Sequence, residues 1–205
     1  MDLQRIFGVR LQSLVTYGDG GGGDAVHTLA LVERLSFQDL TSCAPRMADW
    51  HKAGAAAPLL LTRDEFLRTL DVFPLEYGGI IANHQVVYGE DLLAGLRVTE
   101  SDLRRGCELQ AKSHLIHLRE GYLECGGNPK AVASLIAASA PALSSLLANL
   151  RRLDEGVADR AGFSDGFVNE IAGAAGATIA DPTPLLARYL AAVERLWQEV
   201  DRWRA

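Results

Sequence analysis

A glycine-rich turn between two apolar runs is the part of this sequence best suited to chemistry. The run Leu11–Tyr17 enters the turn Gly18–Asp24, and the run Leu29–Val32 follows it. Such a turn presents backbone N–H groups to a phosphate, because no side chain obstructs the approach. Carboxylates that hold a metal ion would be expected just before the second run, but Ala25–His27 reads AVH. A bare glycine run lacks the lysine and serine of a P-loop, so by itself it is more typical of a surface turn than of a phosphate site.

A second group of residues with possible chemistry is the pair His114 and His117. Three residues apart on a helix, they are near neighbours and could bind a metal ion together. No acid or cysteine is obviously placed to complete such a site, so we interpret them as polar residues of a core or interface. Trp197 is expected in the core, and Trp203 is the better candidate for contact with a partner.

Short strands alternating with helices must position the glycine-rich turn. The capping box of Thr62 and Glu65 begins one of the helices, and Pro45 interrupts another helical stretch, Phe37–Ala53. Pro74 favours an edge position for the strand that contains it. The predicted strands are Arg10–Tyr17, Thr28–Val32, Ala57–Leu61, Asp71–Tyr77 and Gln85–Tyr88.

Long amphipathic helices replace this alternation in the second half of the chain. We expect one from Thr99 to about Tyr122, one from Lys130 to about Leu153 that Pro141 kinks or splits, one over Ser164–Ala174, and one that begins at Pro184. Helices with short connections indicate a bundle, so the predicted domains are residues 1–90 and 91–205.

Three segments resemble the nucleotidyltransferase fold of the polymerase-beta superfamily. They are Tyr17-Gly18 at the end of the first strand, FPLEY at Phe73–Tyr77, and HQVVYGEDLL at His84–Leu93. The helix sequence Leu103–Leu123 is also similar to the first bundle helix of proteins described only as nucleotidyltransferase-like. The resemblance implies an α/β (α+β) domain with a small mixed sheet, followed by a C-terminal helical bundle.

The resemblance also implies a chemistry, in which Mg²⁺ on strand carboxylates neutralises a nucleoside triphosphate. Gly18 matches the motif glycine, and Asp19 stands where the motif has serine. The two alternating acids fall at Ala25 and His27, neither of which is acidic, and Glu76 falls at the third acid. His27 prefers softer metals than magnesium. Glu76 alone would make a weak metal site.

The expected function is therefore that of a catalytically degenerate nucleotidyltransferase-fold protein that binds a nucleotide or a protein, with no cofactor. Its nucleotide-binding candidates are Gly18, Asp19 and His27. The alternative is an active transferase that moves a nucleoside monophosphate to a small molecule or protein. In that case Asp19, Asp24 and Glu76 would hold Mg²⁺ and the nucleoside triphosphate.

Bulk properties limit the partners of the chain. Its 205 residues are 48% hydrophobic, which allows a sizeable core, and the net charge is −6. An acidic chain lacks the basic surface that non-specific nucleic-acid binding requires. We expect no zinc, disulfide framework, signal segment or membrane span, and we expect a cytoplasmic location. The apolar last helix makes a homodimer through the bundle plausible.

Overall fold

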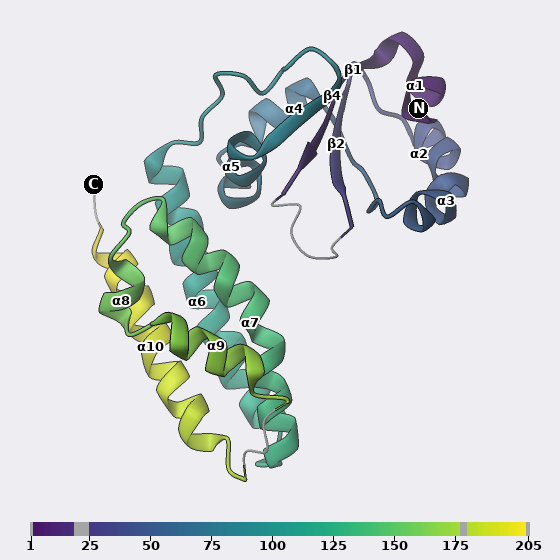
Figure 1. Ribbon diagram of the computed structural model, residues 1–205. Helices are drawn as coiled ribbons and strands as arrows, with labels where there is room; N and C mark the ends of the chain where they lie inside the picture. The colour runs from purple at the N-terminus through teal and green to yellow at the C-terminus, as the bar shows by residue number, and fades with distance from the viewer. Residues whose placement is uncertain (1, 19–24, 177–179, 204–205) are drawn as a thin grey trace. The chain divides into compact units, whose positions relative to one another are not determined.

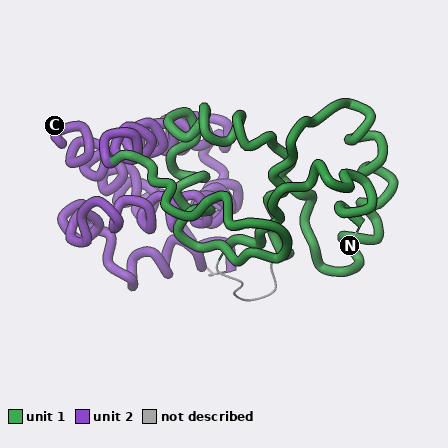
Figure 2. Tube along the Cα trace, turned by 90° about the horizontal axis from the view of Figure 1, so that it is seen from above, with its two compact units in different colours: residues 1–99 green, residues 100–205 purple. Residues whose placement is uncertain are grey.

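The computed structural model describes residues 2–18, 25–176 and 180–203, and the chain divides into two compact units. Unit 1 is Met1–Thr99 and unit 2 is Glu100–Ala205 (Figure 2). Unit 1 combines a small mixed sheet with helices, and unit 2 is helical. An α+β part followed by a helical part agrees with the predicted fold class. The predicted boundary at residue 90 falls earlier, at the start of the connection Glu90–Thr99.

One four-stranded sheet forms in the described part of unit 1, with the order β3-β2-β1-β4. The strands are β1 (Leu11–Tyr17), β2 (His27–Val32), β3 (Leu59–Thr62) and β4 (His84–Gly89). The central strand β1 is antiparallel to both β2 and β4, whereas β2 and β3 are parallel. The predicted strands at these four places are confirmed.

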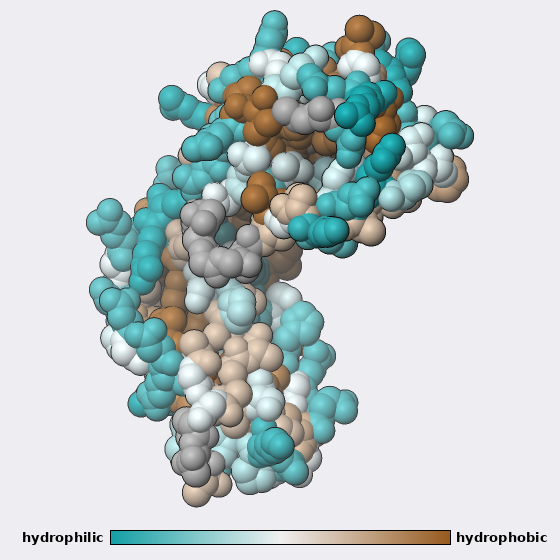
Figure 3. Space-filling model, turned by 45° about the vertical axis from the view of Figure 1, so that its right-hand side comes forward, coloured by the Kyte–Doolittle hydropathy of each residue, from teal (hydrophilic) through white to brown (hydrophobic). Residues whose placement is uncertain are grey.

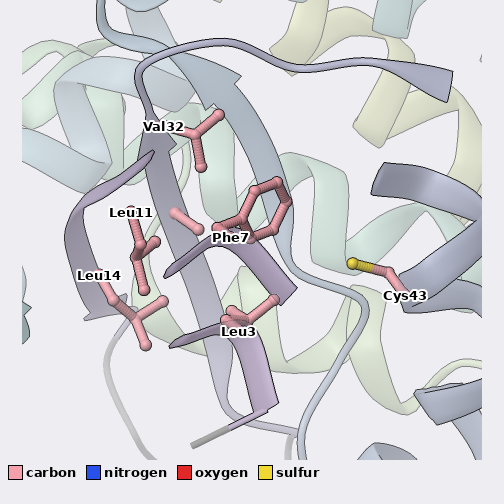
Figure 4. Packing of buried hydrophobic residues seen from close by; sticks show 7 residues of the cluster. Leu3, Phe7, Leu11, Leu14, Val32 and Cys43 are labelled. Atoms are coloured by element: carbon pink, nitrogen blue, oxygen red, sulfur yellow. The ribbon is translucent and has the colours of Figure 1, made fainter. Parts of the chain in front are cut away.

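Helices cover both faces of this sheet (Figure 1). One face carries α1 (Asp2–Phe7), α2 (Phe37–Cys43) and α3 (Met47–Lys52), and the other carries α4 (Arg63–Arg68) and α5 (Pro74–Ala82). Successive residues of a strand point to opposite faces, so β1 sends Leu14 into the first core and Val15 into the second. The first core, part of which Figure 4 shows, contains Leu3, Phe7, Leu11, Leu14, Ala30, Val32 and Cys43.

An ion pair joins the entrance of β1 to the first helix layer. The guanidinium of Arg10 donates to both carboxylate oxygens of Asp39, at 2.7 and 3.0 Å. Asp39 also accepts from the backbone N–H of Ser36 and completes the capping box of α2. These bonds hold the pKa of Asp39 well below its usual range, with the hydrogen bond from Arg10 as the largest cause. The pair thus fixes α2 against the sheet.

The predicted strand Asp71–Tyr77 is wrong. The structure begins helix α5 at Pro74, with Tyr77 and Ile80 buried in the second core. Proline fits the first helical position because an N–H there would have no acceptor within the helix, so its absence costs nothing. The fixed φ of proline also matches that of a helix. The sequence interpretation gave Pro74 the role of an edge-strand residue, and helix initiation proved stronger. The capping box of Thr62 and Glu65 at α4 is confirmed.

Unit 2 consists of helices throughout its described residues. They are α6 (Glu100–Glu124), α7 (Pro129–Arg151), α8 (Val157–Ala161), α9 (Asp165–Gly173) and α10 (Thr183–Arg202). The four predicted helices are confirmed, and the short α8 was missed. Helix α7 runs through Pro141 without a break, so the helix is not split. Ser164 caps α9, where its hydroxyl accepts from the N–H of Phe167.

Helix α7 is long and apolar enough to cross a membrane by length and composition alone. Its inward residues, among them Ile136, Leu143 and Leu147, are buried in the core of unit 2. A core helix can pass the same test, and one face of α7 is packed in this core.

The apolar stripe of α10 is also used inside unit 2. Leu186, Tyr189, Val193, Leu196 and Val200 are all buried there. This stripe was the basis for the predicted homodimer, which stays a prediction. The visible surface in Figure 3 is largely hydrophilic, with hydrophobic patches between.

Gly89 allows β4 to lie close to β1. Its φ is +78°, and a Cβ there would lie 2.0 Å from the carbonyl oxygen of Gln12. We predict that Gly89→Ala lowers the free energy of unfolding by about 1–3 kcal/mol, through backbone strain and this clash.

Gly79, in the middle of α5 with open space around it, is the matched control. Gly79→Ala should stabilise the protein by about 0.5–1 kcal/mol. Urea unfolding measures both, and equal stabilities would contradict the account.

Candidate functional site

Three ring side chains lie in one row across the sheet, at the end where β1 meets the glycine-rich turn. Tyr17 is the partner of His27 on β2 and also of His84 on β4. Directly opposite residues of antiparallel strands share a face of the sheet. The row therefore places His27 and His84 on either side of Tyr17, on the face covered by α4 and α5.

Tyr17 and His27 form a stacked pair. Their ring centroids are 5.6 Å apart, with 30° between the planes. Tyr17 is half-buried against the second core, whereas His27 is exposed. Burial raises the pKa of the Tyr17 phenol above its ordinary value, so this hydroxyl stays protonated at neutral pH. The pair offers solvent a flat aromatic surface bordered by a hydroxyl and an imidazole.

His84 supports this surface from the other side. Its Nδ1 lies 3.0 Å from the carbonyl oxygen of Ile81, and its Nε2 lies 3.1 Å from Oδ1 of Asp91. A carbonyl and a carboxylate only accept hydrogen bonds, so both contacts are made when both ring nitrogens carry hydrogen. The bond from His84 lowers the pKa of Asp91, which also accepts from the N–H of Leu93. His84 is therefore a positioning residue, with a hydrogen-bond acceptor within reach of each ring nitrogen.

Gly18 lies next to this row with a φ of +96°, a conformation that favours glycine. Its N–H donates to the carbonyl oxygen of Asn83 at 3.3 Å. Asn83 directly follows α5, so this bond joins the end of β1 to the end of that helix. Gly18 and His27, two of the predicted nucleotide-binding residues, are thus brought to the same end of the sheet. Asp19 and Asp24 lie outside the described residues.

Glu76 is not brought to this end of the sheet. It is exposed in the first turn of α5, whereas Asn83, which contacts Gly18, follows the last turn. Asn83 is seven positions beyond Glu76, which is about 10 Å along the helix axis. The expectation that Glu76 lies on a strand is therefore wrong. Among the described residues, no three His, Cys, Asp or Glu side chains are grouped so that they could hold a metal ion.

Ala25 and His27, the positions expected for the paired acids, flank a short parallel bridge to Ala55. Val26 forms a parallel bridge with Ala55, and its N–H donates to the carbonyl oxygen of Gly54 at 2.7 Å. His27 begins β2 directly after it. The described groups at this end are thus imidazole, phenol, backbone amide and the carboxylate of Asp91, which is bonded to His84 and Leu93. This set does not match the several oxygen ligands that Mg²⁺ prefers.

The two histidines of α6 have separate environments. His114 is buried and its Nε2 lies 2.6 Å from the hydroxyl of Tyr189, whereas His117 is exposed and contacts Ser113. The Tyr189 hydroxyl is also 3.1 Å from Ser139 Oγ, which donates to the carbonyl of Ile136. Since Ser139 has one hydroxyl proton, Tyr189 donates to Ser139 and His114 donates to Tyr189.

This buried chain of hydrogen bonds connects α6, α10 and α7. Burial lowers the pKa of His114 to about 4 and raises the pKa of Tyr189 to about 12, so both are neutral near pH 7. The interpretation of His114 as a core polar residue agrees with its burial. Trp197 is half-buried beneath the ammonium of Lys112, which lies 3.6 Å from the ring centroid. Trp203 is half-buried at the end of α10.

Comparison with known proteins gives no family for this chain. A scan against protein-family models and a search of curated proteins both found no match. The resemblance to the nucleotidyltransferase superfamily therefore stays a prediction. Sequence reasoning missed Tyr17 as a ring partner of His27 and missed the pair of His84 and Asp91. The one available signal was that Tyr17, His84 and Asp91 all lie within the segments that carry the resemblance.

The lowered pKa of His114 predicts that the free energy of unfolding decreases at acidic pH. Its pKa is about 4 in the folded protein and 6.5 in an unfolded chain, so protonation favours unfolding. The contribution of neutral His114 to the free energy of unfolding is fully present above pH 6.5. It is lost as the pH drops toward 4 and below, by up to about 3 kcal/mol. His114→Gln keeps a donor to Tyr189 but cannot titrate, so its unfolding free energy should lose this pH dependence. The exposed His117→Gln is the control and should retain it. Urea unfolding between pH 4 and 7.5 decides, and identical curves for wild type and His114→Gln would contradict the prediction.

Proposed function

We propose that this chain is a catalytically degenerate nucleotidyltransferase-fold protein that binds a nucleotide without a divalent metal ion. The stacked pair of Tyr17 and His27 is the observation that carries the proposal. It lies beside Gly18, at the place where the resemblance expects a magnesium-bound triphosphate. A flat ring pair suits a nucleobase, because bases stack on aromatic side chains with about 1–3 kcal/mol each.

The polar groups around the ring pair support the same ligand. The His27 imidazole has no hydrogen-bond partner among the described residues and is exposed, so it is free to donate to a phosphate or a base. The Tyr17 hydroxyl stays protonated and offers a second donor. His84 keeps its place through Asp91 and Ile81, which fixes the third ring of the row. Binding then depends on stacking and hydrogen bonds rather than on a metal ion.

The alternative function is an active nucleotidyltransferase in which Asp19, Asp24 and Glu76 hold Mg²⁺. The position of Glu76 at the far end of α5 weighs against it, because Mg²⁺ requires ligands at close to octahedral geometry. A pure protein-binding role, as a homodimer or with another partner through the helical unit, is a further candidate for the test. We place the protein in the cytoplasm, where the free thiols of Cys43, Cys107 and Cys125 would stay reduced.

Thermal unfolding with AMP or ATP tests the proposal directly. A ligand that binds only the folded form raises the melting temperature. We predict that AMP and ATP raise it equally well in EDTA and in Mg²⁺. His27→Ala should weaken binding by about tenfold or more, since it removes one face of the stack. The exposed His51→Ala on α3 is the matched control and should bind as the wild type does.

Two outcomes would contradict the proposal. Stabilisation by ATP only with Mg²⁺, together with transfer of labelled AMP that Glu76→Gln abolishes, would establish the active transferase. No stabilisation by either nucleotide, together with a stable dimer in solution, would favour the protein-binding role.

A further inference from the structure

We propose that unit 1 has a second binding site, for a small molecule that carries one phosphate or carboxylate group. The site is an open cleft of about 700 Å³ in the described structure. Nothing in the proposed function uses it. Its lining residues are Gln12, Val32, Glu33, Arg34, Leu35, Thr62, Arg63, Asp64 and Leu67.

The cleft lies at the end of the sheet opposite the ring row. Val32 and Thr62 are the last residues of the parallel strands β2 and β3, and Gln12 is near the start of the antiparallel β1. Tyr17 is six positions beyond Leu11 along β1, which is a span of about 20 Å. The two sites are therefore distinct. The crevice outside the carboxyl ends of parallel strands is also where open α/β sheets commonly bind ligands.

Two arginines give the cleft its chemistry. Arg34 and Arg63 are exposed and both line it, one after β2 and one after β3. Neither has an acidic partner within 4.0 Å in the part of the chain that the structure describes. Arg10, by contrast, is paired with Asp39 at 2.7 Å. Two unpaired guanidinium groups at one cleft match the planar, two-oxygen edge of a carboxylate or phosphate.

The acids of the cleft limit the charge of the ligand. Asp64 already contacts Arg68, with Oδ2 and Nη1 3.5 Å apart, so its charge is partly balanced within α4. Glu33 is exposed and is the second carboxylate of the lining. With two arginines against two acids, the cleft favours a single compact anionic group over a polyphosphate, which Glu33 and Asp64 would repel.

Neutral groups add little to the anion site, with one exception. The hydroxyl and N–H of Thr62 are occupied by the Glu65 carboxylate in the capping box, so they are not available to a ligand. Gln12 is exposed and its side-chain amide is a further donor. The apolar side chains of Val32, Leu35 and Leu67 give room for a small carbon skeleton next to the anionic group.

Backbone amide NMR on the full chain tests this site separately from the nucleotide site. Titration with inorganic phosphate, and in parallel with malonate, should shift the amide signals of Leu35, Asp64 and Leu67 in a saturable way. A response to one anion only identifies which chemistry the cleft prefers. The signals of Gly18 and Asn83 report on the other end of the sheet, so failure of one proposal leaves the other intact.

Variants of the arginines decide the result. Arg34→Ala and Arg63→Ala should each weaken binding of the anion by about tenfold or more, because each removes charge-assisted hydrogen bonds. Arg5→Ala, which removes an exposed arginine paired with Asp2 on α1 and outside the cleft lining, is the control and should bind within about twofold of the wild type. All three positions are exposed, so the folded spectrum should persist. The proposal is overturned if neither anion shifts the cleft signals, or if the double variant of Arg34 and Arg63 binds as well as the wild type.

Discussion

The hydrogen bonding of β1 on both of its edges is the constraint on which the rest of unit 1 depends. It pairs Tyr17 with His27 on one side and with His84 on the other, and it brings Gln12 to the opposite end of the sheet. A strand has a side-chain period of two, so a shift by one residue would turn Tyr17 to the other face. Gly89, whose missing side chain lets β4 approach Gln12, helps to hold this register.

The ring row has a chemistry different from that of a magnesium site. A metal-dependent transferase neutralises phosphate charge with a cation held by carboxylates, whereas the described residues at this end offer His27, the Tyr17 hydroxyl and backbone groups. Asp91 is the carboxylate that contacts a ring of the row, and it is already bonded to His84 and Leu93. It therefore positions a ring instead of holding an ion. Stacking and hydrogen bonds suit recognition of a nucleotide rather than transfer of its phosphate.

Local patterns in the sequence predicted much of the fold. Alternation identified β1, a short apolar run identified β2, a capping box identified the start of α4, and a helical stripe identified α10. Pro74 was misread because the same residue is compatible with a strand edge and with the first turn of a helix, and tertiary packing of Tyr77 and Ile80 decides between them. The ring row and the cleft combine residues from three or more elements. Their contacts depend on strand order and register, which one sequence does not reveal.

The most direct test of metal-free nucleotide binding is the ¹⁵N NMR signal of the imidazoles, followed while AMP is added in EDTA. The account predicts that the His27 ring signals move in a saturable way. The His84 ring signals should stay in place, because both of its nitrogens remain bonded to Ile81 and Asp91. His27 signals that do not move, or that move only after Mg²⁺ is added, would contradict it.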